Sequence, residues 1–164
     1  MASIFVVTIL SLSLLFINCE ADLIGTICAK SVNPSLCTNI LRSDPRARTA
    51  DLRGLGQIFV EKAKAATQDT ISAAKSVGGS GKPAADTCVS VCGDAIDNLN
   101  QCSAYLKSSG RARVGDLQTK GSAALTDVST CDDEFGDSEP ANVKQASRKA
   151  QDIIDMLLVV ANSL

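Results

Sequence analysis

The sequence contains no histidine and no tryptophan, and Tyr105 is its single tyrosine. Without histidine the chain lacks the commonest general base, the usual activator of serine and cysteine nucleophiles, and the commonest metal ligand. The carboxylates and lysines form no catalytic constellation of their own. We therefore predict that the protein is not an enzyme, and we expect neither a metal nor a cofactor.

Neither sign of charge dominates, and the net charge is only −2. A nucleic-acid-binding protein needs a basic face, so we expect no nucleic-acid partner. Aromatic residues make up only 3% of the chain, which leaves small aliphatic residues to fill the core. Such residues suit close helix packing better than a β-sandwich, and they favour an all-α fold.

The N-terminus carries a 14-residue apolar run, Ile4–Ile17, interrupted only by Thr and Ser. A small-residue cleavage site follows, with Cys19 at −3 and Ala21 at −1. This pattern predicts a signal peptide over residues 1–21 and a mature chain that begins at Asp22. A membrane anchor is the alternative, but it would need about 20 apolar residues. We expect a secreted protein with no membrane span after signal removal.

Four segments between residue 49 and the C-terminus carry apolar stripes with alternating steps of three and four, which predict amphipathic helices. Thr49 is the expected cap of the first segment, with Asp51 in its first turn. Gly54 and Gly56 are expected to weaken that turn, and residues 132–139 to form an acidic loop. The stripes are Leu52, Leu55, Phe59, Ala63, Ala66, Thr70, Ala73 and Val77; Cys88, Val91, Ala95, Leu99, Cys102 and Leu106; Val114, Leu117, Gly121, Ala124, Val128 and Cys131; and Val143, Ala146, Ala150, Ile153, Leu157, Val160 and Leu164.

Short connections between the four helices predict an up-down-up-down bundle over residues 49–164. Residues 22–48 contain Asn33-Pro34, which turns the chain and can begin a helix at Pro34. We expect this region to form a helical hairpin in front of the bundle, within one domain over residues 22–164. The hairpin could pack on its own bundle or on a neighbour's, so both a monomer and a weak homodimer remain open.

Six cysteines remain after the signal peptide, in an oxidising compartment. If the second and third segments form an antiparallel hairpin that turns near Gly110, Cys88 and Cys131 lie at the same level. Both also belong to the apolar stripes. We therefore predict a Cys88–Cys131 bridge.

The other four cysteines divide into one pair and two single thiols. Cys28 and Cys37 flank the Asn33-Pro34 turn, and a bridge between them would staple the N-terminal hairpin. Cys92 and Cys102 lie ten residues apart on one helix, or about 15 Å, which exceeds the roughly 7 Å limit on the Cα separation in a bridge. We expect both to be buried thiols. A redox or zinc site is the alternative, but the paired spacing of a zinc site is missing.

Four stretches of sequence follow one another along the mature chain. They are Ile27-Cys28 with Asn33-Pro34-Ser35-Leu36-Cys37; Thr49-Ala50-Asp51-Leu52; Cys88 with Cys92-Gly93-Asp94-Ala95-Ile96-Asp97-Asn98-Leu99; and Ser122-Ala123-Ala124-Leu125-Thr126 with Thr130-Cys131. Together they resemble the plant invertase and pectin methylesterase inhibitors, most closely a group of pollen proteins named as invertase inhibitors. The resemblance implies a four-helix bundle behind a helical hairpin, with one bridge in the hairpin and one between the second and third bundle helices. It also implies one-to-one binding that covers the substrate cleft of a cell-wall or vacuolar enzyme.

Two positions differ from that family. Cys92 stands where the family usually has Tyr, so we expect different local packing. Known invertase inhibitors carry Pro-Lys-Phe in the loop between the second and third bundle helices, whereas this loop reads Gly110-Arg111-Ala112-Arg113-Val114-Gly115-Asp116. The missing tripeptide favours a pectin methylesterase over an acid invertase as the target. We expect the protein in the apoplast, with the vacuole as the alternative.

The resemblance implies that polar faces of the bundle helices contact the enzyme. An acidic and hydroxyl-rich face could form charge-assisted hydrogen bonds to a basic enzyme surface. The plainer interpretation is a solvated helix face. Arg111 and Arg113 are the alternative contacts, and they fit better if invertase is the target. The candidates on the two helices are Asp94, Asp97, Asn98, Thr126, Asp127 and Thr130.

Two interpretations outside inhibition remain open. A carrier of small apolar ligands would need an internal cavity, and the eight-cysteine pattern of plant lipid-transfer proteins is absent. A family member that has lost inhibition would persist as a secreted protein. Because histidine is missing, any pH switch near pH 5 to 6 on this chain must use carboxylates with raised pKa values.

Overall fold

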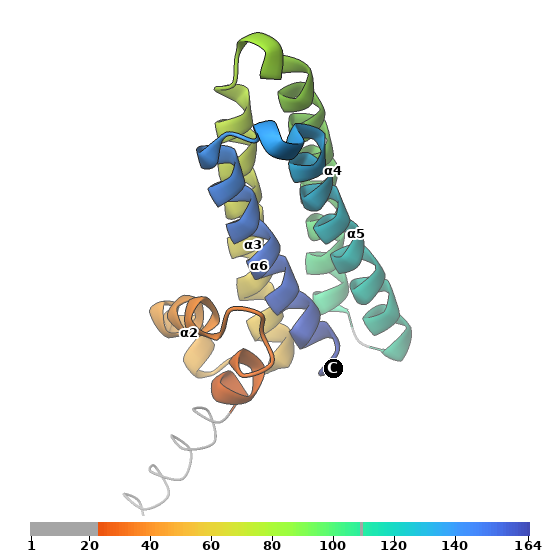
Figure 1. Cartoon of the computed structure of the whole chain (residues 1–164). Helices are drawn as coiled ribbons and strands as arrows, with labels where there is room; N and C mark the ends of the chain where they lie inside the picture. The colour runs from red at the N-terminus through yellow and green to blue at the C-terminus, as the bar shows by residue number, and fades with distance from the viewer. Residues whose placement is uncertain (1–22, 109) are drawn as a thin grey trace, which may run out of the picture.

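The computed structural model describes residues 23–108 and 110–164, so the predicted signal peptide lies outside the described residues. Within that part, all regular elements are helical (Figure 1). Residues 23–28 are also helical. The elements that follow are α2 (Pro34–Ser43), η1 (Pro45–Arg48), α3 (Leu52–Lys75), η2 (Gly79–Gly81), α4 (Lys82–Lys107), α5 (Arg111–Phe135), η3 (Gly136–Ser138) and α6 (Ala141–Ala161).

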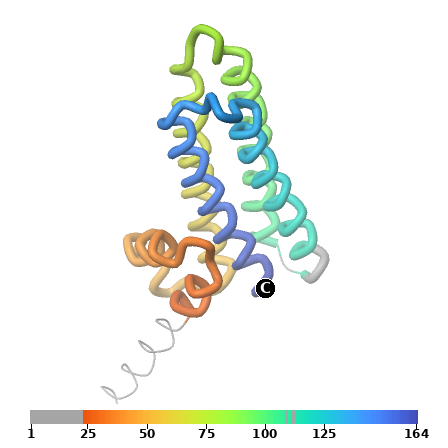
Figure 2. The backbone as a smooth tube through the Cα atoms, in the orientation of Figure 1, coloured from red at the N-terminus to blue at the C-terminus, as the bar shows by residue number. Residues whose placement is uncertain are grey.

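The four long helices α3, α4, α5 and α6 form a bundle with alternating directions (Figure 2). Each packs on two neighbours: α4 contacts α3 and α5, and α6 contacts α3 and α5. α4 and α6 therefore lie diagonally across the bundle. The all-α bundle predicted from the apolar stripes is confirmed.

The N-terminal region packs against one end of this bundle. Asn33 caps α2, because its side chain accepts a hydrogen bond from the Leu36 amide, and Pro34 occupies the first helical turn. The Cys28–Cys37 bridge, with a Cα separation of 5.4 Å, ties α2 to residues 23–28 as the spacing predicts. Asn33 Nδ2 donates to Asp152 of α6 at 2.9 Å. The hairpin therefore contacts the bundle of its own chain.

The start of α3 differs from the expectation. Asp51 is the N-cap, accepting from the Gly54 amide at 2.8 Å, whereas Thr49 follows η1 and ends it. Gly56 also allows a close approach between helices. A Cβ at Gly56 would lie 2.8 Å from a methyl carbon of Leu106 on α4, so glycine lets α3 and α4 pack tightly here.

The predicted acidic loop over residues 132–139 is mostly helical. α5 continues to Phe135, which is buried and packs with Val143 of α6 in an apolar cluster. Burial of Phe135 favours an α5 that extends through residues 132–135, which the acidic composition of the segment had predicted to be a loop. The helix ends at Gly136, whose φ of 50° lies in the region that glycine tolerates.

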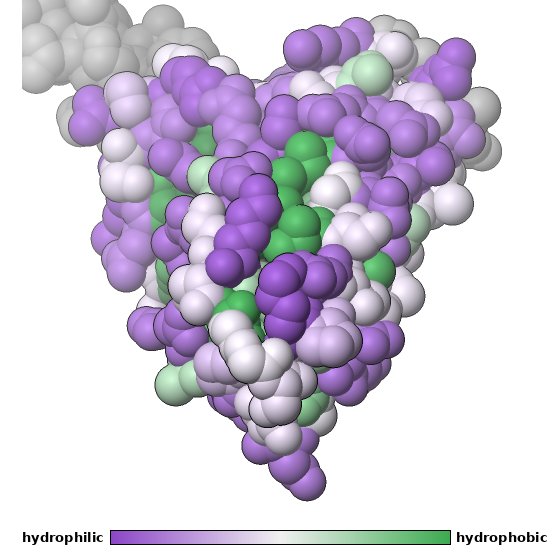
Figure 3. All heavy atoms as spheres, turned by 90° about the horizontal axis from the view of Figure 1, so that it is seen from above, coloured by the Kyte–Doolittle hydropathy of each residue, from purple (hydrophilic) through white to green (hydrophobic). Residues whose placement is uncertain are grey.

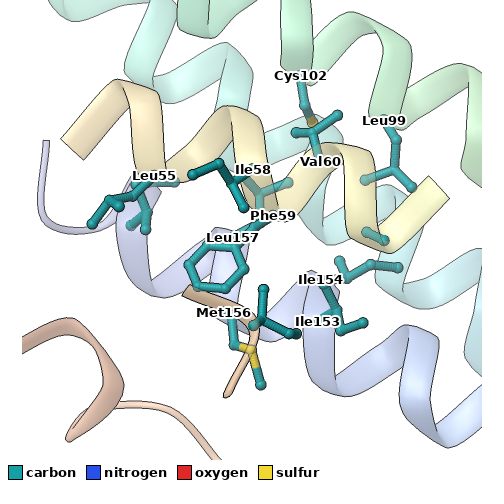
Figure 4. Close-up of a cluster of buried hydrophobic side chains, with 14 of the residues drawn as sticks. Leu55, Ile58, Phe59, Val60, Leu99, Cys102, Ile153, Ile154, Met156 and Leu157 are labelled. Atoms are coloured by element: carbon teal, nitrogen blue, oxygen red, sulfur yellow. The ribbon is translucent and has the colours of Figure 1, made fainter. Parts of the chain in front are cut away.

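The core is built mainly from aliphatic residues, together with the buried rings of Phe59 of α3, shown in Figure 4, and Phe135 of α5. Alanines occupy the close contacts between helices, and Ala63, Ala95 and Ala150 are each 0% exposed. Among the described residues, no helix is both long enough and apolar enough to span a membrane. The large hydrophobic residues that are exposed in that part are Val32 and Leu164. Viewed from above, the surface is mostly hydrophilic, with a small group of hydrophobic residues visible near the centre of the view (Figure 3).

Candidate functional site

The seam between α4 and α5 is held by a covalent bridge. Cys88 and Cys131 are paired with a Cα separation of 4.2 Å and are both fully buried. Cys92 lies one turn further along α4, and the three sulfur atoms are within 4.8 Å of one another. The bridge fixes the register of the two helices and therefore which polar side chains meet further along the seam.

Within two turns beyond Cys92, the seam brings together three of the predicted contact residues. Asn98 Nδ2 donates to Asp127 Oδ2 at 2.9 Å, joining α4 to α5. Asp94 precedes Asn98 by four residues on the same side of α4, and its charge acts on Asp127. We call Asp94, Asn98 and Asp127 the seam cluster.

Burial is the main cause that raises the pKa of Asp127, and the charge of Asp94 raises it further. The hydrogen bond from Asn98 and the charge of Lys120 act in the opposite direction. Asp94 itself is exposed and Asp127 is half-buried. The cluster thus offers one open carboxylate and one carboxyl group held in place by an amide.

The two threonines of α5 use their hydroxyl protons within the helix. Thr126 donates to the Ser122 carbonyl at 3.1 Å, and Thr130 donates to the Thr126 carbonyl at 2.9 Å. Their oxygens therefore remain available as acceptors from outside. Thr126 is exposed, whereas Thr130 is half-buried near the bridge.

The remaining predicted contacts lie apart from the seam cluster. Asp97 is exposed on α4, facing outward from the seam by helical periodicity. Arg113 is close to the turn between α4 and α5, about 21 Å along α5 from Asp127. Its guanidinium lies 5.7 Å from the centre of the Tyr105 ring and pairs with Asp116 at 3.3 Å. The Arg111 side chain lies outside the described part of the structure.

Sequence reasoning missed the supports of this region. Arg53 of α3 donates to the carbonyls of Tyr105, Leu106 and Ser108, the last at 2.7 Å, and so caps the C-terminus of α4. No local pattern marks such a distant cap. The Tyr105 and Arg113 pair was detectable, because the two residues lie on either side of the expected turn.

The cysteines of the bundle do not form a reactive site. Burial raises the pKa of Cys92 to about 12 and that of Cys102 to about 11, so both are protonated thiols near neutral pH. Cys88 and Cys131 share a disulfide and have no thiolate to offer a metal. The polar groups that the α4–α5 surface presents are those of the seam cluster.

Comparison with known proteins places this geometry in a context. Residues 22–163 match the family described as plant invertase/pectin methylesterase inhibitor. The chain is 36% identical over 155 residues to the pectinesterase inhibitor of Actinidia deliciosa, covering 90% of this chain and 82% of that protein.

Two further relatives have names that differ in the target. A Platanus acerifolia protein, whose name marks invertase inhibition as provisional, is 29% identical over 154 residues, covering 85% of this chain and 82% of that protein. The crystal structure of a mutant pectin methylesterase inhibitor from Arabidopsis matches with a TM-score of 0.73 at 26% identity, covering 86% of this chain and 96% of that one.

Proposed function

Because this chain belongs to the plant invertase/pectin methylesterase inhibitor family, we propose that it is a secreted inhibitor that binds a pectin methylesterase one-to-one and covers its substrate cleft. The observation that carries the proposal is the seam cluster, in which Asn98 and Asp127 are joined at 2.9 Å beside the exposed Asp94. The sequence similarity to a pectinesterase inhibitor supports a pectin methylesterase as the target. The active unit would be the mature chain, residues 22–164, in the apoplast.

The seam cluster suits a basic partner. The carboxylate of Asp94 is open to an arginine or lysine of the enzyme, and such charge-assisted bonds are stronger than neutral ones. Asp127 and Asn98 are already ordered by their mutual hydrogen bond and by the bridge between Cys88 and Cys131. Little conformational entropy is lost when groups on rigid helices bind, which favours a tight complex.

Invertase is the second candidate, supported by relatives from Platanus and by Arg113. The guanidinium of Arg113 is held against Tyr105 and paired with Asp116, so its position near the α4–α5 turn is defined. In that case the contact surface would shift from the seam cluster toward the turn. The exposed cation would then meet an acidic surface of the enzyme.

Titration of both enzymes with mature, disulfide-bonded protein tests the choice. We expect the activity of the pectin methylesterase to fall linearly to an endpoint at one inhibitor per enzyme, while the invertase remains active. Asp94→Lys should weaken inhibition by about tenfold or more, because it places a like charge against the enzyme's cations. Asp137→Lys, in η3 and exposed, makes the same charge change away from the seam cluster and should have little effect.

Loss of invertase activity alone would transfer the proposal to the second candidate, and Arg113→Ala would then become the decisive variant. Full activity of several isoforms of both enzymes would contradict inhibition. A family member without inhibitory activity would then be the remaining interpretation. Equal inhibition by the Asp94→Lys variant would place the contact elsewhere on the bundle.

A further inference from the structure

A groove of about 430 Å³ runs along the first half of α6 and ends at the N-terminus of α2. Asn33 and Leu36 of α2 form its end, and the α6 residues Lys144, Gln145, Arg148, Lys149 and Asp152 are among those that line it. No described residue of α4 or α5 lines this groove, so it is separate from the seam between those two helices. The proposed inhibitory contact therefore does not use it.

The groove is basic in a chain whose net charge is −2. Lys144, Arg148 and Lys149 follow one another at helical spacing, so Lys144 and Arg148 are neighbours on one helix face, about 5 to 6 Å apart at Cβ. A second depression of about 200 Å³ shares Lys149 and adds Lys62 of α3. The acidic residue of the groove, Asp152, accepts a hydrogen bond from Asn33 at 2.9 Å and is occupied within the protein.

Two of the three cations make long ion pairs with carboxylates, and the third makes none among the described residues. Lys144 lies 3.6 Å from Glu139 and Lys149 lies 3.9 Å from Asp69, both long contacts made by exposed lysines. The pair between Lys149 and Asp69 is exposed on both sides and contributes about 0 to 1 kcal/mol, so a stronger anion can replace it. Glu139 is only 4% exposed, and Lys144 reaches it from the surface. Arg148 is exposed and has no carboxylate partner among the described residues.

The start of α6 adds to this positive potential. Ala141 lines the groove, and the N-cap, Pro140, has no side-chain acceptor for the free amides of the first turn. These amides and the helix dipole favour a negative charge at this end. Further groups suit a sugar rather than a bare ion: the amide of Gln145 can bond hydroxyl groups, and Leu36 offers an apolar contact for a ring face.

We infer that this groove binds an anionic carbohydrate chain with carboxylates at intervals, a polyuronate. The choice of ligand rests on the proposed function. Hydrolysis of a methyl ester of a uronic acid polymer releases methanol and leaves a carboxylate on the polymer. The product of the target enzyme is therefore a polyanion of the kind that the groove fits. An inhibitor that binds it is retained where the esterase has already acted.

Binding to polymers tests the inference with the mature, disulfide-bonded chain. Co-sedimentation would use polygalacturonate, fully methyl-esterified pectin and polyglutamate, without calcium and at about 20 mM ionic strength, where screening is weak. Arg148→Gln/Lys149→Gln removes two groove charges. Arg48→Gln/Lys107→Gln removes one arginine and one lysine from exposed positions outside the groove. Esterase inhibition is measured in parallel on every variant.

We expect the protein to bind polygalacturonate and to bind esterified pectin far more weakly. The groove variant should bind about fivefold more weakly or worse, the sum of two surface ion contacts, while the control variant stays within about twofold. Absence of binding, or equal loss in both variants, would overturn the inference. Binding of polyglutamate with the same dependence on Arg148 and Lys149 would identify an acidic polypeptide as the ligand and overturn it as well.

The inhibition assay separates this inference from the proposed function. Normal esterase inhibition by a protein that ignores polygalacturonate removes the groove inference and leaves the inhibitor intact. If the protein binds polygalacturonate through the groove but inhibits no esterase, the groove inference stands and the proposed inhibitory function is wrong.

Discussion

The α4–α5 seam and the α6 groove differ in charge and in how firmly they are built. The seam is acidic, cross-linked by Cys88–Cys131 and closed by the hydrogen bond between Asn98 and Asp127. The groove is basic, and its lysines make only long ion pairs at 3.6 and 3.9 Å. A rigid surface suits recognition of one folded enzyme, whereas loosely paired cations on long side chains suit a repetitive polymer.

Removing the bridge of the seam gives the largest expected effect. Cys88→Ala/Cys131→Ala should lower the free energy of unfolding by about 4 kcal/mol, because the bridge closes a long loop in the unfolded chain. It should also reduce esterase inhibition, since the register of Asn98 and Asp127 is no longer fixed. Urea unfolding with an inhibition assay measures both.

Cys28→Ala/Cys37→Ala is the matched variant for the N-terminal bridge. Its short loop predicts a smaller loss of about 2.7 kcal/mol, and the seam should keep its geometry. Equal loss of inhibition in both double variants would show that inhibition follows global stability and does not depend on the fixed geometry of the seam.

Acid should affect two parts of the chain in opposite ways. Two hydrogen bonds from Arg46 hold the pKa of Asp44, which is 8% exposed, at about 2 instead of 3.8. A lowered pKa stabilises the fold above pH 3.8, and this contribution is lost as pH falls toward 2. Asp44→Asn should therefore cost about 1 to 2 kcal/mol at neutral pH and little at pH 2.

Asp127 should show the reverse. Burial raises its pKa above 3.8, so the folded chain holds a proton that the unfolded chain has released. Its contribution is fully present below pH 3.8 and is lost as pH rises through the raised value. The Asp127→Asn variant has no titrating group at this position, so it should not show this loss of stability as pH rises. Unfolding curves from pH 2 to pH 7 measure both, and parallel pH profiles for the Asp44→Asn and Asp127→Asn variants would contradict the distinction.

The bundle was predictable because its helices carry continuous apolar stripes, and burial of Phe59, Leu99 and Leu157 follows directly from them. Element ends were less predictable. Thr49 and Asp51 are both good caps by residue type, but Thr49 ends η1 and Asp51 begins α3, a choice that the sequence pattern does not make. The extension of α5 is accompanied by burial of Phe135 in an apolar cluster that draws residues from α3, α4, α5 and α6, and no local pattern predicts that cluster.

The candidate site was predictable as residues but not as geometry. Asp94, Asn98 and Asp127 were identified by resemblance, yet their meeting depends on the register that Cys88 and Cys131 impose. The groove was less predictable from the sequence than the seam cluster. The spacing of Lys144 and Arg148 suggests a basic helix face, but its closure at one end requires α2 to pack beside α6.

Carboxyl footprinting of the esterase complex tests the central claim most directly. A water-soluble carbodiimide labels exposed carboxylates, and mass spectrometry compares each site in the free and the bound inhibitor. The account predicts that Asp94 and Asp97 on α4, both exposed in the free chain, lose their labelling in the complex, while Asp69 beside the groove keeps it. Protection of Asp69 with unchanged labelling of Asp94 and Asp97 would show that the enzyme docks on the opposite face and would contradict the account.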